Sequence, residues 1–139
     1  MNSNRILSGQ SFLPHENPQK LIFMLHGYGD TAENFIHIAN FLDQPELEAN
    51  YFALNAPSII SEYSLGRQWF DLYPNGIYIA NAGIDEIKII QSDILTTSKL
   101  LENTVNQIIS PVAGAITINL RFIKLAFAYA HIISSAALP

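Results

Sequence analysis

The feature that most constrains the fold is a short apolar run that ends in a glycine-rich turn. Residues 20–25 read Lys-Leu-Ile-Phe-Met-Leu, and His26-Gly-Tyr-Gly29 follows at once. A run of this length and composition is typical of a strand buried on both faces of a parallel sheet. The two glycines indicate a tight turn whose backbone another group can approach closely. This segment therefore indicates an α/β protein.

An amphipathic helix is predicted over residues 31–43. Asp30 is expected to cap its amino end, with Glu33 returning the hydrogen bond as in a capping box. Pro45 lies just beyond its carboxyl end. The residues expected on its buried face recur at helical spacing and are Phe35, Ile38, Ala39 and Leu42.

The following segments complete an alternation of strands and helices. Residues 51–54 (Tyr-Phe-Ala-Leu) predict a second buried strand, which the turn residues 55–58 end. An aromatic-rich irregular segment then extends to about Gly83, and a long helix is predicted over residues 84–109. Ser110-Pro111 is expected to end that helix. The order predicts a mostly parallel sheet flanked by helices.

Three blocks in this order are similar to sequences of the phospholipase/carboxylesterase family. They are Leu25–Thr31 (Leu-His-Gly-Tyr-Gly-Asp-Thr), Leu54–Ser58 (Leu-Asn-Ala-Pro-Ser) and Gln68–Leu72 (Gln-Trp-Phe-Asp-Leu). Members of this family are small α/β-hydrolases and include the acyl-protein thioesterases. The resemblance covers residues 10–109 and fades after Pro111. It implies an α/β-hydrolase fold and a small ester or thioester substrate, with no cofactor.

The resemblance also assigns a role to the glycine-rich turn. In that family the residue after His-Gly donates a backbone N–H to the oxyanion, and this residue is Tyr28 here. Gly27 and Gly29 would let the substrate approach, and a neighbouring helix amino end favours negative charge. In the other interpretation the glycines only form a tight strand–helix turn. His26, Gly27, Tyr28 and Gly29 are therefore predicted to be the remnant of an oxyanion loop.

The nucleophile of such a site is missing from the sequence. The fold requires a serine in a Gly-x-Ser-x-Gly turn, followed by an acid and then a histidine. No Gly-x-Ser-x-Gly occurs in the 139 residues. Residues Leu125–Ala130 show a weak similarity to this serine turn, with Ala128 in the serine position. An alanine has no oxygen to attack a carbonyl. We therefore expect no catalytic nucleophile, acid or base, and no activity of this chain alone.

The carboxyl-terminal part differs in composition from the rest. No acidic residue follows Glu102. We expect one incomplete, truncated α/β-hydrolase domain over residues 1–139, family-like over 1–109 and divergent over 110–139. A frame disruption near residues 110–120 would produce this contrast, and a natural variant with Ala128 is the other explanation. The coding DNA distinguishes them, because a disrupted frame predicts Gly-x-Ser-x-Gly in another frame downstream.

Other polar and aromatic residues receive structural expectations. His26 is expected to support the loop through backbone hydrogen bonds and not to act as a base, because the catalytic histidine comes last in the hydrolase order. Trp69 and Phe70 are substrate-cleft candidates that could line an apolar groove. Equally, they could pin a loop as core aromatics. Glu62 and Arg67 are expected to be solvated loop charges.

Charge and composition exclude several other classes. The net charge of −5 provides no basic surface for nucleic acid. Cysteine is absent, and neither His15 nor His37 has metal-ligand spacing, so no metal site is expected. No apolar leader stretch precedes the first strand, so a cytoplasmic location is expected. Arg121 and Lys124 interrupt the apolar segment 112–138, which makes a membrane span unfavourable.

Two other functions compete with the inactive hydrolase fragment. The chain could be a non-catalytic binding module that docks a partner through an exposed sheet edge. It could also associate weakly with membranes through its apolar carboxyl-terminal third. A pulldown tests the first alternative, and a carbonate-resistant membrane fraction would favour the second.

Overall fold

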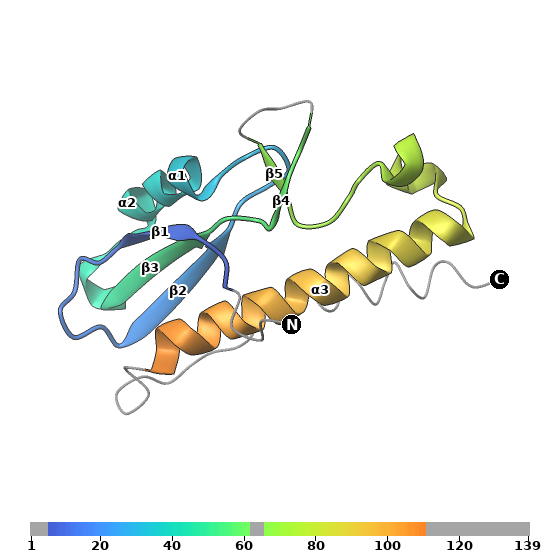
Figure 1. Ribbon diagram of the computed structural model, residues 1–139. Helices are drawn as coiled ribbons and strands as arrows, with labels where there is room; N and C mark the ends of the chain where they lie inside the picture. Colours follow the sequence, from blue (N-terminus) through green and yellow to red (C-terminus); the bar gives the residue numbers. More distant parts are fainter. Residues whose placement is uncertain (1–5, 62–65, 111–139) are drawn as a thin grey trace.

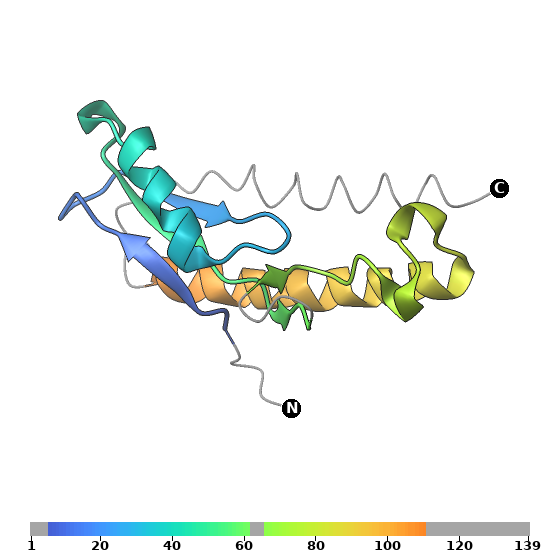
Figure 2. The same ribbon diagram turned by 90° about the horizontal axis from the view of Figure 1, so that it is seen from above.

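The computed structural model describes residues 6–61 and 66–110, which form a small sheet with helices on both faces (Figures 1 and 2). The main sheet has three strands in the order β1-β3-β2. Their bounds are Gly9–Phe12 for β1, Lys20–Leu25 for β2 and Ala49–Leu54 for β3. The two strands predicted from apolar runs, β2 and β3, are confirmed.

The described sheet is mixed. β2 pairs with β3 in parallel, from Lys20 opposite Ala49 to Leu25 opposite Leu54. β1 pairs with β3 antiparallel. The prediction of a mostly parallel sheet is therefore not confirmed over the described residues. β1 is not predicted from the sequence, because Gly-Gln-Ser-Phe has one large apolar residue and no alternating pattern.

Burial is concentrated in β3 and not in β2. β3 lies between the other two strands, and five of its six residues are buried. In β2 only Met24 is buried and four other residues are half-buried. The strand is therefore less buried than the sequence predicted. Among the described strands β2 has a neighbour on one side only, which leaves most of its side chains half-covered.

Side chains of β2 nevertheless alternate between two apolar clusters. Ile22 and Met24 pack with the cluster that contains the helical residues Ala32 and Ala39. Leu21, Phe23 and Leu25 pack with the cluster that contains buried residues of the long helix α3 (Ile84–Ile109). Because successive strand residues point to opposite faces, the two clusters lie on opposite sides of the sheet.

The first helical segment is divided into three pieces. α1 (Ala32–Phe35) continues through a 3₁₀ turn (Ile36–Ile38) into α2 (Ala39–Leu42). The capping prediction is wrong, because Thr31 is the N-cap and its Oγ1 accepts from the N–H of Asn34 at 3.4 Å. Asp30 instead accepts from the N–H of Thr31 at 2.8 Å.

The predicted buried face of this segment is only half right. Ala39 is buried and Phe35 packs against the core. Ile38 and Leu42 are 40% and 48% exposed. A 3₁₀ turn has 3.0 residues per turn instead of 3.6, so it rotates the following residues out of the phase that the sequence pattern assumed.

The segment between β3 and the long helix contains short regular elements. β4 (Ser58–Ile59) and β5 (Arg67–Gln68) form an antiparallel two-stranded sheet. Two 3₁₀ turns follow, at Pro74–Gly76 and Ile79–Asn81.

The long helix α3 spans Ile84–Ile109, which confirms the predicted bounds. Its buried apolar residues follow helical spacing and include Ile90, Leu101, Val105 and Ile109. In Figure 1 the carboxyl-terminal part of α3 lies beside the sheet, on the side opposite α1 and α2, and its amino-terminal part extends past the strands. No helix of the described residues is both long enough and apolar enough to cross a membrane. The expectations for Glu62, Arg121, Lys124 and Ala128 concern residues outside the described ranges.

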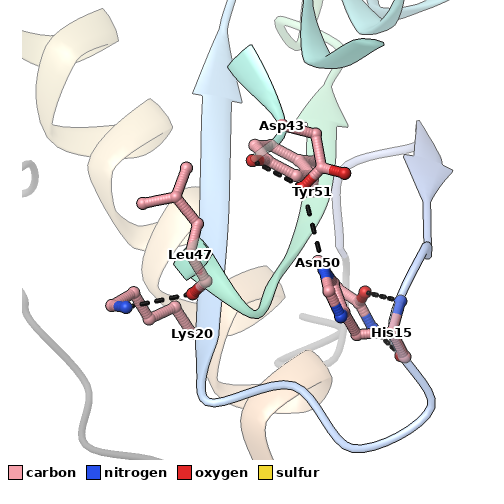
Figure 3. A network of polar contacts seen from close by, with 6 residues as sticks. All are labelled: His15, Lys20, Asp43, Leu47, Asn50 and Tyr51. Carbon is pink, nitrogen blue, oxygen red and sulfur yellow. Dashed lines mark hydrogen bonds and ion pairs between the residues drawn. The ribbon is translucent and has the colours of Figure 1, made fainter. Parts of the chain in front are cut away.

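A partly buried polar network holds the amino end of β3 (Figure 3). The side chain of Asn50 accepts from the N–H of His15 at 3.0 Å and donates to its carbonyl at 2.9 Å. The hydroxyl of Tyr51 donates to Asp43 at 3.2 Å. His15 Nε2 lies 3.8 Å from the same Asp43 oxygen. This network ties the β1–β2 connection and the end of α2 to the central strand.

Candidate functional site

The turn after β2 is built around the buried side chain of His26. Nε2 of His26 accepts a hydrogen bond from the N–H of Ala56 at 3.1 Å. Nδ1 lies 2.7 Å from the carbonyl oxygen of Gly27. A neutral imidazole with its proton on Nδ1 makes both bonds at once. Both ring nitrogens are thus engaged with backbone, the arrangement expected of a residue that supports the loop.

Trp69 connects this turn to α3. Its indole N–H donates to the carbonyl of His26 at 2.8 Å, and the two rings lie 5.3 Å apart in a tilted arrangement. The carbonyl of Trp69 accepts from the hydroxyl of Thr97 on α3 at 2.7 Å. Of the two roles considered for Trp69, these contacts are those of a residue that pins the loop. A role of Trp69 or the half-buried Phe70 in lining a cleft stays a prediction.

The glycines of the turn occupy open space. A Cβ atom built on Gly27 or Gly29 would meet nothing within 4 Å. Gly29 has a φ of +82°, a left-handed conformation that glycine adopts without strain. Its N–H donates to the carbonyl of Arg67 at 3.0 Å. Tyr28 lies between the two glycines and is 42% exposed. The oxyanion role of Tyr28 stays a prediction.

Arg67 is part of the site and not a solvated charge, so that expectation is wrong. Its N–H donates to the carbonyl of Asp30 at 3.2 Å, which fixes β5 beside the turn after β2. Its guanidinium donates to the carbonyl of Ala56 at 3.0 Å, and the residue is half-buried. His26 and Arg67 therefore bind the N–H and the carbonyl of the same residue.

Asn55 is a site residue that was not predicted from the sequence. Its buried side chain accepts from the N–H of Ala32 at 2.8 Å and donates to Ser8 and Glu33 at 3.2 and 3.3 Å. It thus joins the turn after β3 to the first turn of α1. The signal was present, because an asparagine immediately after an apolar strand and before Ala-Pro is a polar residue placed to satisfy turn backbone.

The carboxylate of Glu33 is stabilised in its charged form. A hydrogen bond from its own backbone N–H is the largest cause that lowers its pKa below the ordinary value. Burial acts in the opposite sense, and the amide of Asn55 lowers the pKa further. The hydrogen bond from Asn55 makes Glu33 part of the connection between α1 and the turn after β3.

Within residues 6–61 and 66–110 no three His, Asp or Glu side chains are grouped so that they could hold a metal ion. His15 lies in the network at the other end of β3 (Figure 3). His37 is exposed on the 3₁₀ turn between α1 and α2.

Comparisons with known proteins find similarity to one protein family and to a solved structure. The model of the phospholipase/carboxylesterase family matches residues 12–119. Among solved structures, the crystal structure of esterase PE8 aligns with a TM-score of 0.58 and 21% sequence identity. The alignment covers 76% of this chain and 46% of that chain. At this identity the likeness supports the fold. No curated protein matches the sequence.

Proposed function

This chain belongs to the phospholipase/carboxylesterase family, and on that premise we propose that it is the amino-terminal portion of a serine carboxylic-ester hydrolase. Its α/β-hydrolase fold is shown by the family match and the esterase likeness. The chain spans less than half of the esterase PE8 chain. The activity and substrate of a whole enzyme are therefore part of the proposal.

The observation that carries this proposal is the way the turn after β2 is held. Backbone N–H groups stabilise a developing oxyanion only if they are fixed before the reaction. Here His26, Trp69 and Arg67 attach the turn to β3, α3 and β5. A Cβ atom on Gly27 or Gly29 would meet nothing within 4 Å, so a substrate could approach the backbone of this turn closely. We assign the oxyanion donor to the N–H of Tyr28, with a small ester or thioester as the substrate of the complete enzyme.

The same proposal states that the chain alone has no ester-hydrolase activity. The sequence contains no Gly-x-Ser-x-Gly. Removal of triad members leaves about 10³–10⁴-fold of catalysis over water, which comes from the oxyanion hole and binding. A chain that lacks all three triad groups, and part of the binding site with them, should show a rate enhancement over water no larger than this residual value.

Probe labelling tests the proposal. The purified chain is treated with a fluorophosphonate probe and, separately, with a short-chain aryl ester. We expect no saturable label and a hydrolysis rate equal to that of the heat-denatured chain, with an active family esterase as positive control. Stoichiometric labelling of one serine, located by peptide mapping and lost on its substitution by alanine, would overturn the inactivity.

A second candidate function is favoured by one feature of the sheet. Among the described residues β2 pairs with β3 alone, so its other edge has no described strand partner. An added strand from another protein could bind there through main-chain hydrogen bonds. A pulldown partner that slows amide exchange in β2, with exchange in α3 unchanged, would favour this binding module over the hydrolase fragment.

A further inference from the structure

The turn at Pro74–Gly76 contains the only Asn-Gly pair of the sequence. Asn75 is exposed and has φ 55° and ψ 22°, a left-handed conformation. The turn lies beside the amino end of α3, away from the loop proposed for the hydrolase (Figure 1). Nothing in the proposed function uses it.

Two hydrogen bonds hold the groups of this pair. The side-chain amide of Asn75 donates to Glu86 Oε1 at 2.9 Å. The backbone N–H of Gly76 donates to the carbonyl of Tyr73 at 2.8 Å. The other oxygen of Glu86 accepts from the N–H of Gly83 at 3.0 Å. One carboxylate therefore ties the turn to the first residues of α3.

An asparagine followed by glycine has the covalent arrangement for intramolecular deamidation. The backbone nitrogen of the glycine attacks the side-chain Cγ, and the absence of a Cβ on glycine leaves this approach unhindered. We propose that Asn75 is a site of spontaneous deamidation and that the native turn restrains the reaction. This inference is independent of the hydrolase proposal.

The reaction needs no reagent except water. A bond forms between the Gly76 nitrogen and Cγ of Asn75, the Cγ–Nδ2 bond breaks, and ammonia leaves with the proton from the Gly76 nitrogen. The resulting succinimide is opened by water at either carbonyl. The products are aspartate or isoaspartate at position 75.

The native contacts oppose this reaction at both reacting groups. The attacking N–H is bound to Tyr73, and the leaving amide is bound to Glu86. The N–H of Ile77 donates to Pro74 at 3.0 Å and closes the same turn. Deamidation should therefore proceed through local opening of the turn, because opening frees the backbone to reorient.

The product would change the contact with α3. A carboxylate at position 75 cannot donate to Glu86, and at neutral pH the two charges would repel. In the unmodified protein the hydrogen bond from Asn75 is the largest cause that lowers the pKa of the Glu86 carboxyl. Modification would therefore release the turn from the helix.

The test compares the full chain in native buffer and in urea, both at the same mildly alkaline pH. Peptide mapping with mass detection and an isoaspartate assay follow each asparagine with time. In urea we expect Asn75 to convert faster than every other asparagine. In the native chain we expect Asn75 to convert more slowly than it does in urea. Asn81, exposed and followed by Ala82, is the internal control. No conversion of Asn75 in urea, or equal rates in the two states, would overturn the proposal.

A pair of variants tests the role of Glu86. Glu86→Ala should accelerate native conversion of Asn75 about fivefold, the factor that corresponds to one ordinary hydrogen bond. Lys88→Ala is the matched control, because its exposed ammonium lies 3.8 Å from Asp85 and makes no described contact with the turn. Circular dichroism first establishes that both variants fold. Equal rates in Glu86→Ala and Lys88→Ala would show that the native contact does not restrain the site.

Discussion

The N–H of Ala56 donates to Nε2 of His26 at 3.1 Å, across 30 positions of the sequence. This hydrogen bond joins the turn after β3 to the turn after β2. Parallel strands end at the same edge of a sheet, so the bond fixes the relative position of the two turns at that edge. His26 is 3% exposed, so this hydrogen bond is shielded from water in the folded protein.

Substitution of His26 should therefore cost stability. His26→Ala leaves the buried N–H of Ala56 without its acceptor, a loss of about 1–3 kcal/mol in the free energy of unfolding. Urea denaturation followed by far-UV circular dichroism measures it. The matched control is His37→Ala, on the exposed face of the first helical segment, where we expect a change within about 0.5 kcal/mol. Similar losses in the two variants would contradict the structural role of His26.

Trp69 should report directly on the same turn. It is the only tryptophan of the chain, and its indole N–H binds the carbonyl of His26. Trp69→Phe keeps an aromatic ring but removes this donor, so it should lower the free energy of unfolding by about 0.5–1.5 kcal/mol. The variant is measured by circular dichroism, since it lacks the fluorophore.

In the parent chain, His26→Ala should shift the tryptophan emission to longer wavelength, because loss of the packed imidazole exposes the indole to water. His37→Ala should leave the emission unchanged. An unchanged spectrum in His26→Ala would show that Trp69 does not depend on this contact.

The network at the amino end of β3 gives a separate prediction. Asn50→Ala removes both hydrogen bonds to the backbone of His15 (Figure 3). With a net value of about 0.5–1.5 kcal/mol for each bond, the free energy of unfolding should fall by roughly 1–3 kcal/mol. Asn40→Ala is the control, because Asn40 is exposed and makes one long bond of 3.4 Å. Equal stabilities of the two variants would contradict the prediction.

Alkaline pH should destabilise the protein through Tyr51. Burial raises the pKa of its hydroxyl above the ordinary value of 10.0, and the hydrogen bond to Asp43 raises it further. The folded state therefore keeps the proton at a pH where the unfolded state loses it. The contribution of Tyr51 to the free energy of unfolding is therefore fully present below pH 10.0 and is lost as the pH rises through the pKa of the folded state.

Tyr51→Phe removes this titration, so its unfolding free energy should fall less steeply over the same alkaline range than that of the parent chain. Urea denaturation at a series of pH values gives both slopes. Identical slopes for the two proteins would overturn the assignment.

The elements that the sequence predicted well are those whose pattern is local. The bounds of α3 follow from its apolar spacing and from Ser110-Pro111, and β2 and β3 follow from uninterrupted apolar runs. The strand β1 was missed, because its position depends on pairing with β3 and not on its own residues. The buried face of the first helical segment was misjudged, because the pattern could not show the 3₁₀ turn at Ile36–Ile38.

The sequence by itself determined the family, the strand–turn–helix order and the His-Gly-Tyr-Gly loop, because apolar periodicity and glycine chemistry act over a few neighbouring residues. Only the tertiary structure decided how that loop is held. Arg67, read from the sequence as a solvated charge, binds the carbonyl of Ala56. Asn55, read as a turn residue, joins the loop's helix to β3. The partners of Arg67 and Asn55 lie 11 and 23 positions away in the sequence. Which backbone groups are available to them depends on the fold, because the fold decides which groups stay unpaired, and no local sequence pattern predicts this.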